Sequence, residues 1–144
     1  MLKHVIDGVS KKLSDSFKDM RVYTSNVEQG LKEPCFFVAL IKSNRNQIRG
    51  SLYADSDSVV VHYIPRDSDE LEDIVVVLES LYAVLEYIPF QDGSIRGIEM
   101  SGQIADNAAH FYVKYDAHVI YESKKEESME NITANTGLKE NKNG

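Results

Sequence analysis

The chain has 144 residues, of which 42% are hydrophobic and 27% charged, and this length and composition are those of one globular domain that can bury a core without a metal ion or a disulfide. With 16 Lys and Arg against 23 Asp and Glu the net charge is -7, which disfavours binding to phosphate polyanions unless basic groups are concentrated locally. Apolar residues form neither a signal-peptide block nor an uninterrupted run that could cross a bilayer, so we expect a protein of the cytosol without a membrane partner.

The first third of the sequence predicts one helix followed by two strands. Between residues 2 and 17 apolar residues recur every three or four positions, which is the spacing of an amphipathic helix. Residues 21–25 are rich in β-branched and aromatic side chains and predict a strand. After a turn at Gly30 and Pro34, the apolar run at residues 35–41 predicts a central strand, covered on both faces or pressed against a neighbouring subunit.

The middle of the sequence predicts a polar loop and a third strand. Residues 43–47 are polar and predict the loop. Residues 52–53 could begin a strand, but the polar stretch at residues 55–58 interrupts it. Residues 59–64 resume a strongly β pattern, which Pro65 ends.

A second helix is predicted after this strand. Asp67 followed by Glu70 resembles a capping box, and an apolar stripe then continues to residue 88, where Pro89 stops it. The triplet of valines at residues 75–77 favours a strand locally, but the helical period is sustained over several turns and outweighs it.

The last part of the sequence predicts a long hairpin and a tail. Residues 95–104 and 109–121 form its two arms, with the turn at Asp106 and Asn107. Alternation along the second arm places the odd-numbered residues from 111 to 121 on the core face. Residues 123–144 are rich in Lys, Glu and Asn and predict a flexible polar tail.

These elements predict the fold class. We expect a single α+β domain over residues 1–122 with the order α-β-β-β-α-β-β. A mostly antiparallel sheet with two helices packed on it and a long C-terminal hairpin accounts for that order.

The sequence contains no recognisable catalytic or cofactor-binding pattern. A Gly-rich phosphate loop, a nucleophile elbow and a Cys/His catalytic arrangement are all absent from it. Cys35, the single cysteine, lies in an apolar run and predicts a small buried hydrophobe in a reducing compartment. The histidines show no ligand spacing, so we expect no metal site and place them at the surface, in packing or at an interface: His4, His62, His110 and His118.

Two weaker acidic patterns have simple explanations. Four aspartates lie close in sequence but lack the spacing of a calcium loop, and they predict solvated turns: Asp55, Asp57, Asp67 and Asp69. The stretch Glu122-Ser123-Lys124 matches a short element of some metal-dependent nucleases, in which the carboxylate binds Mg²⁺ and the lysine steadies the attacking water. It lies where the predicted fold ends. We therefore predict no enzymatic activity, with a small nuclease using Glu122 and Lys124 as the alternative from another class.

Strand-borne aromatic residues outnumber the places in a small core. Because strand side chains alternate, some of these residues must face outward, at an interface or beneath helices of the same monomer: Tyr23, Phe36, Phe37, Tyr53, Tyr63, Tyr112, Tyr115 and Tyr121. The same reasoning about exposure selects the candidate interface residues, which are Arg45, Arg49, Tyr53, Tyr112, Lys114 and His118.

One block of sequence carries a family resemblance. Residues 27–37 read Val-Glu-Gln-Gly-Leu-Lys-Glu-Pro-Cys-Phe-Phe, within a longer stretch at residues 22–41. With the segments 61–65, 81–88 and 95–115, this block resembles the bacteriophage tail terminator, or tail-completion, proteins of prophages from Gram-positive bacteria. The resemblance covers residues 1–122, although the run at residues 49–55 is less basic and aromatic than the family leads us to expect.

The resemblance implies a non-enzymatic assembly role. A tail terminator forms a ring, usually a hexamer, on the last ring of tail-tube protein, where it ends tube growth and offers a surface for head-tail joining. Its implied partners are itself, the tail-tube protein and head-tail connector proteins, with DNA passing through the lumen unbound and no cofactor. It is made in the host cytoplasm and ends at the head-proximal end of the virion tail. The nearest alternative is another head-tail connector or minor tail protein.

Overall fold

A computed structural model of the protein describes residues 1–24 and 30–122. The predicted tail at residues 123–144 lies outside them, as do residues 25–29, which include the end of the first predicted strand. In the described part the elements follow in the order α1 (Leu2–Ser16), β1 (Arg21–Tyr23), β2 (Cys35–Arg49), β3 (Leu52–Ile64), α2 (Leu71–Val84), β4 (Tyr87–Phe90), β5 (Gly93–Ala105) and β6 (Ala108–Ile120).

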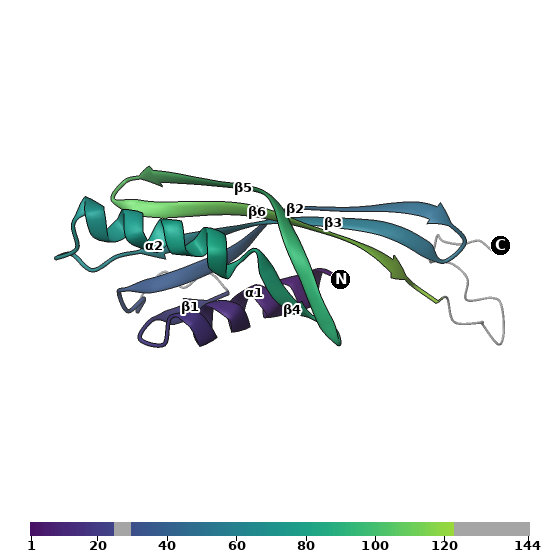
Figure 1. Ribbon diagram of the computed structural model, residues 1–144, viewed down its shortest axis with the longest axis horizontal. Helices are drawn as coiled ribbons and strands as arrows, with labels where there is room; N and C mark the ends of the chain where they lie inside the picture. Colours follow the sequence, from purple (N-terminus) through teal and green to yellow (C-terminus); the bar gives the residue numbers. More distant parts are fainter. Residues whose placement is uncertain (25–29, 123–144) are drawn as a thin grey trace.

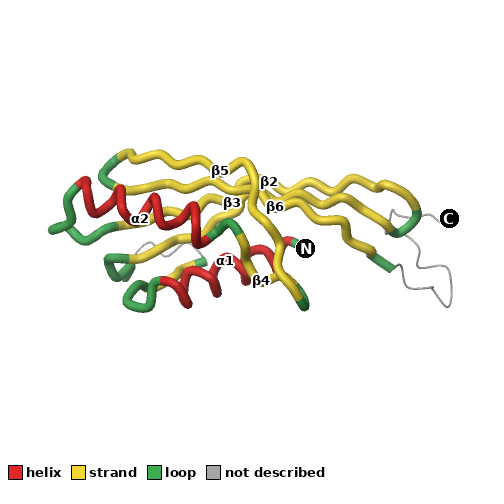
Figure 2. The backbone as a smooth tube through the Cα atoms, in the orientation of Figure 1, coloured by secondary structure: helices red, strands yellow, loops and turns green. Residues whose placement is uncertain are grey.

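The strands form one sheet, and both helices lie on the same side of it (Figure 1). The strand order across the sheet is β1-β2-β3-β6-β5-β4. The short β1 runs parallel to β2, while the remaining neighbours are antiparallel. This confirms the predicted α+β class with a mostly antiparallel sheet and two packed helices, which Figure 2 shows by secondary structure.

The core lies between the helices and one face of the sheet, which we call the inner face. Alternation in β6 places Phe111, Val113 and Tyr115 there, all buried, as predicted. Odd-numbered residues of β3 share this face, because Val61 pairs with Phe111. The helices contribute the apolar residues of their predicted stripes, including the buried Val5, Val9 and Leu13 of α1 and Ile74 and Leu81 of α2.

The helix α1 lies directly against the backbone of β4. A Cβ atom added at Gly8 would overlap the carbonyl oxygen of Pro89, so the close approach of the two elements depends on the missing side chain. Gly8 is buried inside the helix, where glycine otherwise weakens helix formation. Packing against β4 explains its place.

The second helix, α2, is shorter than the apolar stripe predicted, and the structure contains one strand, β4, that the predicted order lacks. Helix α2 ends at Val84, and the residues that follow form β4, which pairs with the start of β5. Ile88 is buried, as the stripe predicted, but it reaches the core from a strand. A proline at position 89 is tolerated because β4 is the outermost strand of the sheet.

The start of α2 also differs in detail. The first helical residue is Leu71, and the capping pair is Glu70 with Asp73, where the Glu70 backbone N–H donates to the Asp73 carboxylate at 2.8 Å. The predicted pair, Asp67 with Glu70, was placed three residues too early. Residues 67–68 lie in a turn whose Arg66 N–H donates to the Asp69 carboxylate.

The predicted polar loop at residues 43–47 and the predicted interruption at residues 55–58 are both wrong. These residues belong to β2 and β3, which form one long hairpin that turns at Gly50 and Ser51. Their polar side chains are compatible with strands because they pair across the hairpin, with Ser43 opposite Asp57 and Arg45 opposite Asp55.

Candidate functional site

Half of the β2–β3 hairpin projects beyond the body of the protein with the end of β6 beside it (Figure 1). Strand β1 pairs with β2 only at residues 35–37, and β5 pairs with β6 only as far as Tyr115. Beyond these points β2, β3 and β6 continue as three strands. We call this part, residues 40–58 and 114–120, the arm.

The inner face of the arm carries a polar cluster centred on Asp55. This carboxylate is only 4% exposed and accepts hydrogen bonds from Arg45 Nε at 3.1 Å and Nη2 at 3.3 Å. The Tyr121 hydroxyl also donates to it. The Arg45 guanidinium lies 3.8 Å from the centre of the Tyr121 ring, and the amino group of Met1 donates to the Tyr121 hydroxyl at 3.2 Å. The cluster therefore joins β2 and β3 to Tyr121, the residue after β6, and to Met1, the residue before α1.

These contacts account for two perturbed ionisation equilibria. Burial, followed by the hydrogen bond to Asp55, raises the pKa of Tyr121 to about 12. Burial alone would lower the pKa of Arg45, but the hydrogen bond to Asp55 and the charges around it raise the pKa overall. Both groups keep their protons at neutral pH, so Tyr121 and Arg45 act as fixed hydrogen-bond donors to Asp55.

Asp57 lies two residues further along the same face and has a hydrogen-bond donor for only one of its two carboxylate oxygens. It is 1% exposed and accepts a hydrogen bond from the Ser43 hydroxyl at 2.7 Å through Oδ1. Its Oδ2 is buried and has no hydrogen-bond donor among the described residues. Asp55 and Asp57 were predicted in a solvated turn, and that prediction is wrong: they lie in a strand, beneath the residues that pair with them.

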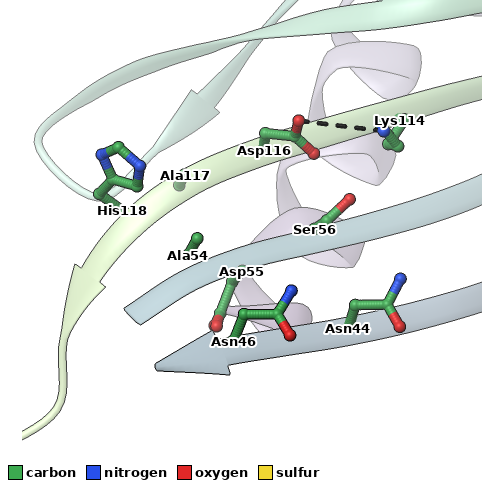
Figure 3. Close-up of a pocket in the computed structure, with 9 residues that line it drawn as sticks. All are labelled: Asn44, Asn46, Ala54, Asp55, Ser56, Lys114, Asp116, Ala117 and His118. Carbon is green, nitrogen blue, oxygen red and sulfur yellow. Dashed lines mark ion pairs between the residues drawn. The ribbon is translucent and has the colours of Figure 1, made fainter. Parts of the chain in front are cut away.

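The outer face of the arm is shallow and polar. Small side chains of β3 form the floor of a hollow of about 480 Å³, with Asn44 and Asn46 of β2 on one side and Asp116 and His118 of β6 on the other (Figure 3). The hollow is open, and its lining includes Ser56 with its cross-strand neighbour Asp116. An open, shallow and polar hollow of this kind suits contact with another protein surface.

Lys114 is fixed at the edge of this hollow. Its Nζ lies 3.1 Å from a Glu99 carboxylate oxygen and 4.0 Å from one of Asp116. The hydrogen bond to Glu99, then the charge of Asp116, raise the pKa of Lys114, so its charge is present at all physiological pH values.

The structure distributes the six predicted interface residues over three surfaces. Arg45 and the half-buried Tyr53 lie on the inner face, Arg49 is exposed near the tip, and three lie along the outer face of β6: Tyr112, Lys114 and His118. All except Tyr112 belong to the arm. Their contacts with other proteins remain a prediction.

Sequence reasoning missed a set of exposed apolar residues. On the arm these are Leu40, Ile41, Ile48 and Ile120, and on α2 the most exposed are Leu71 and Val76. The signal was hidden because residues 43–47 were assigned to a loop, so that Ile48 and its strand neighbours were not examined as part of a surface.

Two histidines form a pair that their sequence positions do not reveal. His62 of β3 and His110 of β6 are cross-strand neighbours, with their Nδ1 atoms 2.7 Å apart, so one ring donates a hydrogen bond to the other. Burial and then His110 lower the pKa of His62. No group of three or more His, Cys, Asp or Glu residues in the described chain is placed to hold a metal ion.

The remaining sequence candidates, Cys35 and Glu122, lie outside the arm. Cys35 is buried, as predicted, and burial followed by the charge of Glu33 raises the pKa of its thiol, which disfavours the reactive thiolate. Glu122 is exposed, while Ser123 and Lys124 lie outside the described residues. No helix in the described part of the chain is long and apolar enough to cross a membrane.

A protein-family model described as phage tail terminator protein matches residues 4–128. The match extends from the first turn of α1 past the end of β6, so it concerns the whole fold and includes the arm. No curated protein matches the chain.

Proposed function

The chain belongs to the phage tail terminator family, whose members are structural proteins of the virion tail, and from this premise we propose that it caps the tail tube as a ring, ends tube elongation and provides the surface for head-tail joining. Its proposed partners are further copies of itself, the tail-tube protein and the connector proteins of the head. It acts first in the host cytoplasm and then at the head-proximal end of the tail.

The arm is the observation that carries this proposal. A strand at the edge of a sheet presents unpaired N–H and C=O groups, which proteins normally cover or blunt. Here three strands extend past both helices with an edge on either side. Exposed isoleucines lie near the tip, where Ile48 is 50% and Ile120 is 64% exposed. Backbone groups and apolar side chains arranged in this way support contacts with other protein chains.

A ring follows from contacts between unlike surfaces. When one patch of a subunit binds a different patch of the next, the assembly closes into a ring if the rotation allows it. A hexamer is the proposed stoichiometry. The net charge of -7 supports a lumen through which DNA slides without adhering, because phosphate groups are repelled by an anionic surface. Tight duplex binding at moderate salt would exclude such a lumen.

Tail length in a phage lacking this chain tests the proposal. Loss of a terminator leaves tube growth unchecked, so electron microscopy should show overlong tubes without heads. A complementing copy of the wild-type chain should restore a uniform length. Tails of normal length beside detached, filled heads would assign the chain to head-tail joining alone, and normal infectious particles would overturn the proposal.

A further inference from the structure

Within the described residues the arm has two strand edges without a neighbouring strand. On β2 the open edge follows residue 37, where pairing with β1 stops. On β6 it follows residue 115, where pairing with β5 stops. These edges lie on opposite sides of β3, because the order of the three strands is β2-β3-β6. One arm therefore carries two different edges that face away from each other.

We propose that the β2 edge of one copy pairs with the β6 edge of the next copy, so that the arms join into a continuous sheet around the ring. This inference rests on the proposed function and names the contact that closes the ring. Both β2 and β6 are antiparallel to β3, so they run parallel to each other. A neighbour related by rotation about an axis along the strands thus presents its β2 parallel to β6.

The lengths of the two edges match. Register shifts interrupt β2 between Leu40 and Lys42 and again between Gln47 and Arg49, which leaves residues 42–47 as a regular stretch. The open part of β6 is residues 116–120. Bulges end regular pairing. At equal levels residues 44–47 of β2 face residues 116–119 of β6, so four residues can pair on each side, which is enough for a short strand.

Charge along the two edges is complementary. From residue 42 to 49, β2 carries no acidic residue and has the basic residues Lys42 and Arg49, together with Arg45, whose charge is paired with Asp55 on the inner face. From residue 116 to 122 the chain carries Asp116 and Glu122 and neither Lys nor Arg. Opposite charges favour one partner over another more than they add affinity. The pattern selects a β2–β6 contact over contacts of either edge with its own kind.

The register of β2 and β6 against β3 shows which residues would face each other across the joint. Asn44 and Asp116 lie level, because both pair with Ser56, which places Asp116 of one copy two residues along the edge from Lys42 of the next. Lys42 is itself level with Lys114, because both pair with Ser58, and the charge of Lys114 is already paired with Glu99 at 3.1 Å. Near the tip Leu52 pairs with both Arg49 and Ile120, so Ile120 would lie level with Arg49 across the joint, with Ile48 the next residue along β2. The contact accounts for two of the exposed apolar residues of the arm.

Cysteine pairs across the proposed joint test the contact in the full-length chain assembled on tail-tube protein. Asn46 and His118 lie level on the outer face, because both pair with Ala54. A chain carrying Asn46→Cys and His118→Cys should give, after mild oxidation, a ladder of disulfide-linked multimers on a non-reducing gel, which reductant removes. A second pair, Asn44→Cys with His118→Cys, covers a register offset by two residues.

Each single variant is a matched control. Because the two edges are different surfaces, single variants should stay monomeric on the same gel, and the native Cys35 is buried. A dimer band from a single variant would show that like edges meet, which overturns the inference. Capped tubes by electron microscopy without a ladder from either pair would overturn the edge contact and leave the proposed function standing. Tubes that are never capped by the wild-type chain would remove both.

Charge reversal gives a second readout that needs no cysteine. Lys42→Glu and Asp116→Lys should each lower the fraction of chain found in rings, and the two together should restore it. Losses that add instead of cancelling would contradict the contact. Lys114 lies 4.0 Å from Asp116 and 3.1 Å from Glu99. Neither substitution changes Lys114 or Glu99, so the closer of these two ion pairs is present in every variant.

Discussion

The two aspartates on the inner face of the arm should respond differently when each loses its charge. Asp55→Asn removes the ion pair with Arg45, whose contacts are 3.1 and 3.3 Å, and weakens the acceptor for the Tyr121 hydroxyl. Hydrogen bonds to charged groups contribute about 1.5–3 kcal/mol. The Arg45 side chain is 50% exposed, so solvent screening places the loss near the lower end, at about 1.5 kcal/mol.

Asp57→Asn should have no such cost. The amide oxygen still accepts the hydrogen bond from Ser43, and the substitution removes a buried charge whose Oδ2 has no donor in the described chain. A neutral amide is less costly to bury than a carboxylate. We expect the free energy of unfolding to be unchanged or higher by up to about 1 kcal/mol.

Urea unfolding of the free chain, followed by far-ultraviolet circular dichroism, measures both effects. Protein concentration must be equal and low, because self-assembly stabilises the folded state. Equal slopes for the variants and the wild type would show that the midpoints report stability alone. Equal destabilisation by the two substitutions would refute the reasoning, since it would mean that Asp57 has a favourable charged partner.

Three further predictions concern the body of the protein. Acidification should destabilise the fold from about pH 6.5 downward. The pKa of His62 is lowered in the folded state, so the unfolded chain takes up the proton first. The variant His62→Gln, which still contacts His110, should flatten the dependence of stability on pH. Gly8→Ala should destabilise the fold by about 1–3 kcal/mol, because the added Cβ overlaps the β4 backbone. As the control, Ser14→Ala on the exposed face of the same helix should stabilise the fold slightly, and thermal melts of the two variants measure both effects. Tyr115→Phe should cost about 1 kcal/mol in urea unfolding, because its hydroxyl donates at 2.7 Å to the carbonyl of residue 85; no change would show that water replaces it.

The parts of the fold that sequence could predict are those with a regular apolar period. The stripe of α1 and the alternation of β6 each place apolar residues on one face only, and both were predicted correctly. The short strand β4 was missed because Leu85 and Ile88 lie three positions apart and both are buried, which imitates a continuing helical stripe.

The parts of the arm that belong to β2 and β3 were not predicted because these strands are polar on both faces there. Alternation disappears when Ser43, Arg45 and Asp57 replace apolar residues on the inner face. What stabilises the strands there is side-chain pairing between residues 10 and 14 positions apart, which depends on the register of the hairpin. His62 and His110 are 48 positions apart, and their contact likewise appears only when β3 and β6 are paired.

Negative-stain electron microscopy of the purified chain with polymerising tail-tube protein tests the central claim most directly. The account predicts tubes that stop growing when the chain is added and that carry a ring at one end. The same tube protein without the chain should give a broad range of longer tubes. Tubes of unchanged length with both ends bare, at chain concentrations in excess over tube ends, would contradict the claim that this protein terminates the tail.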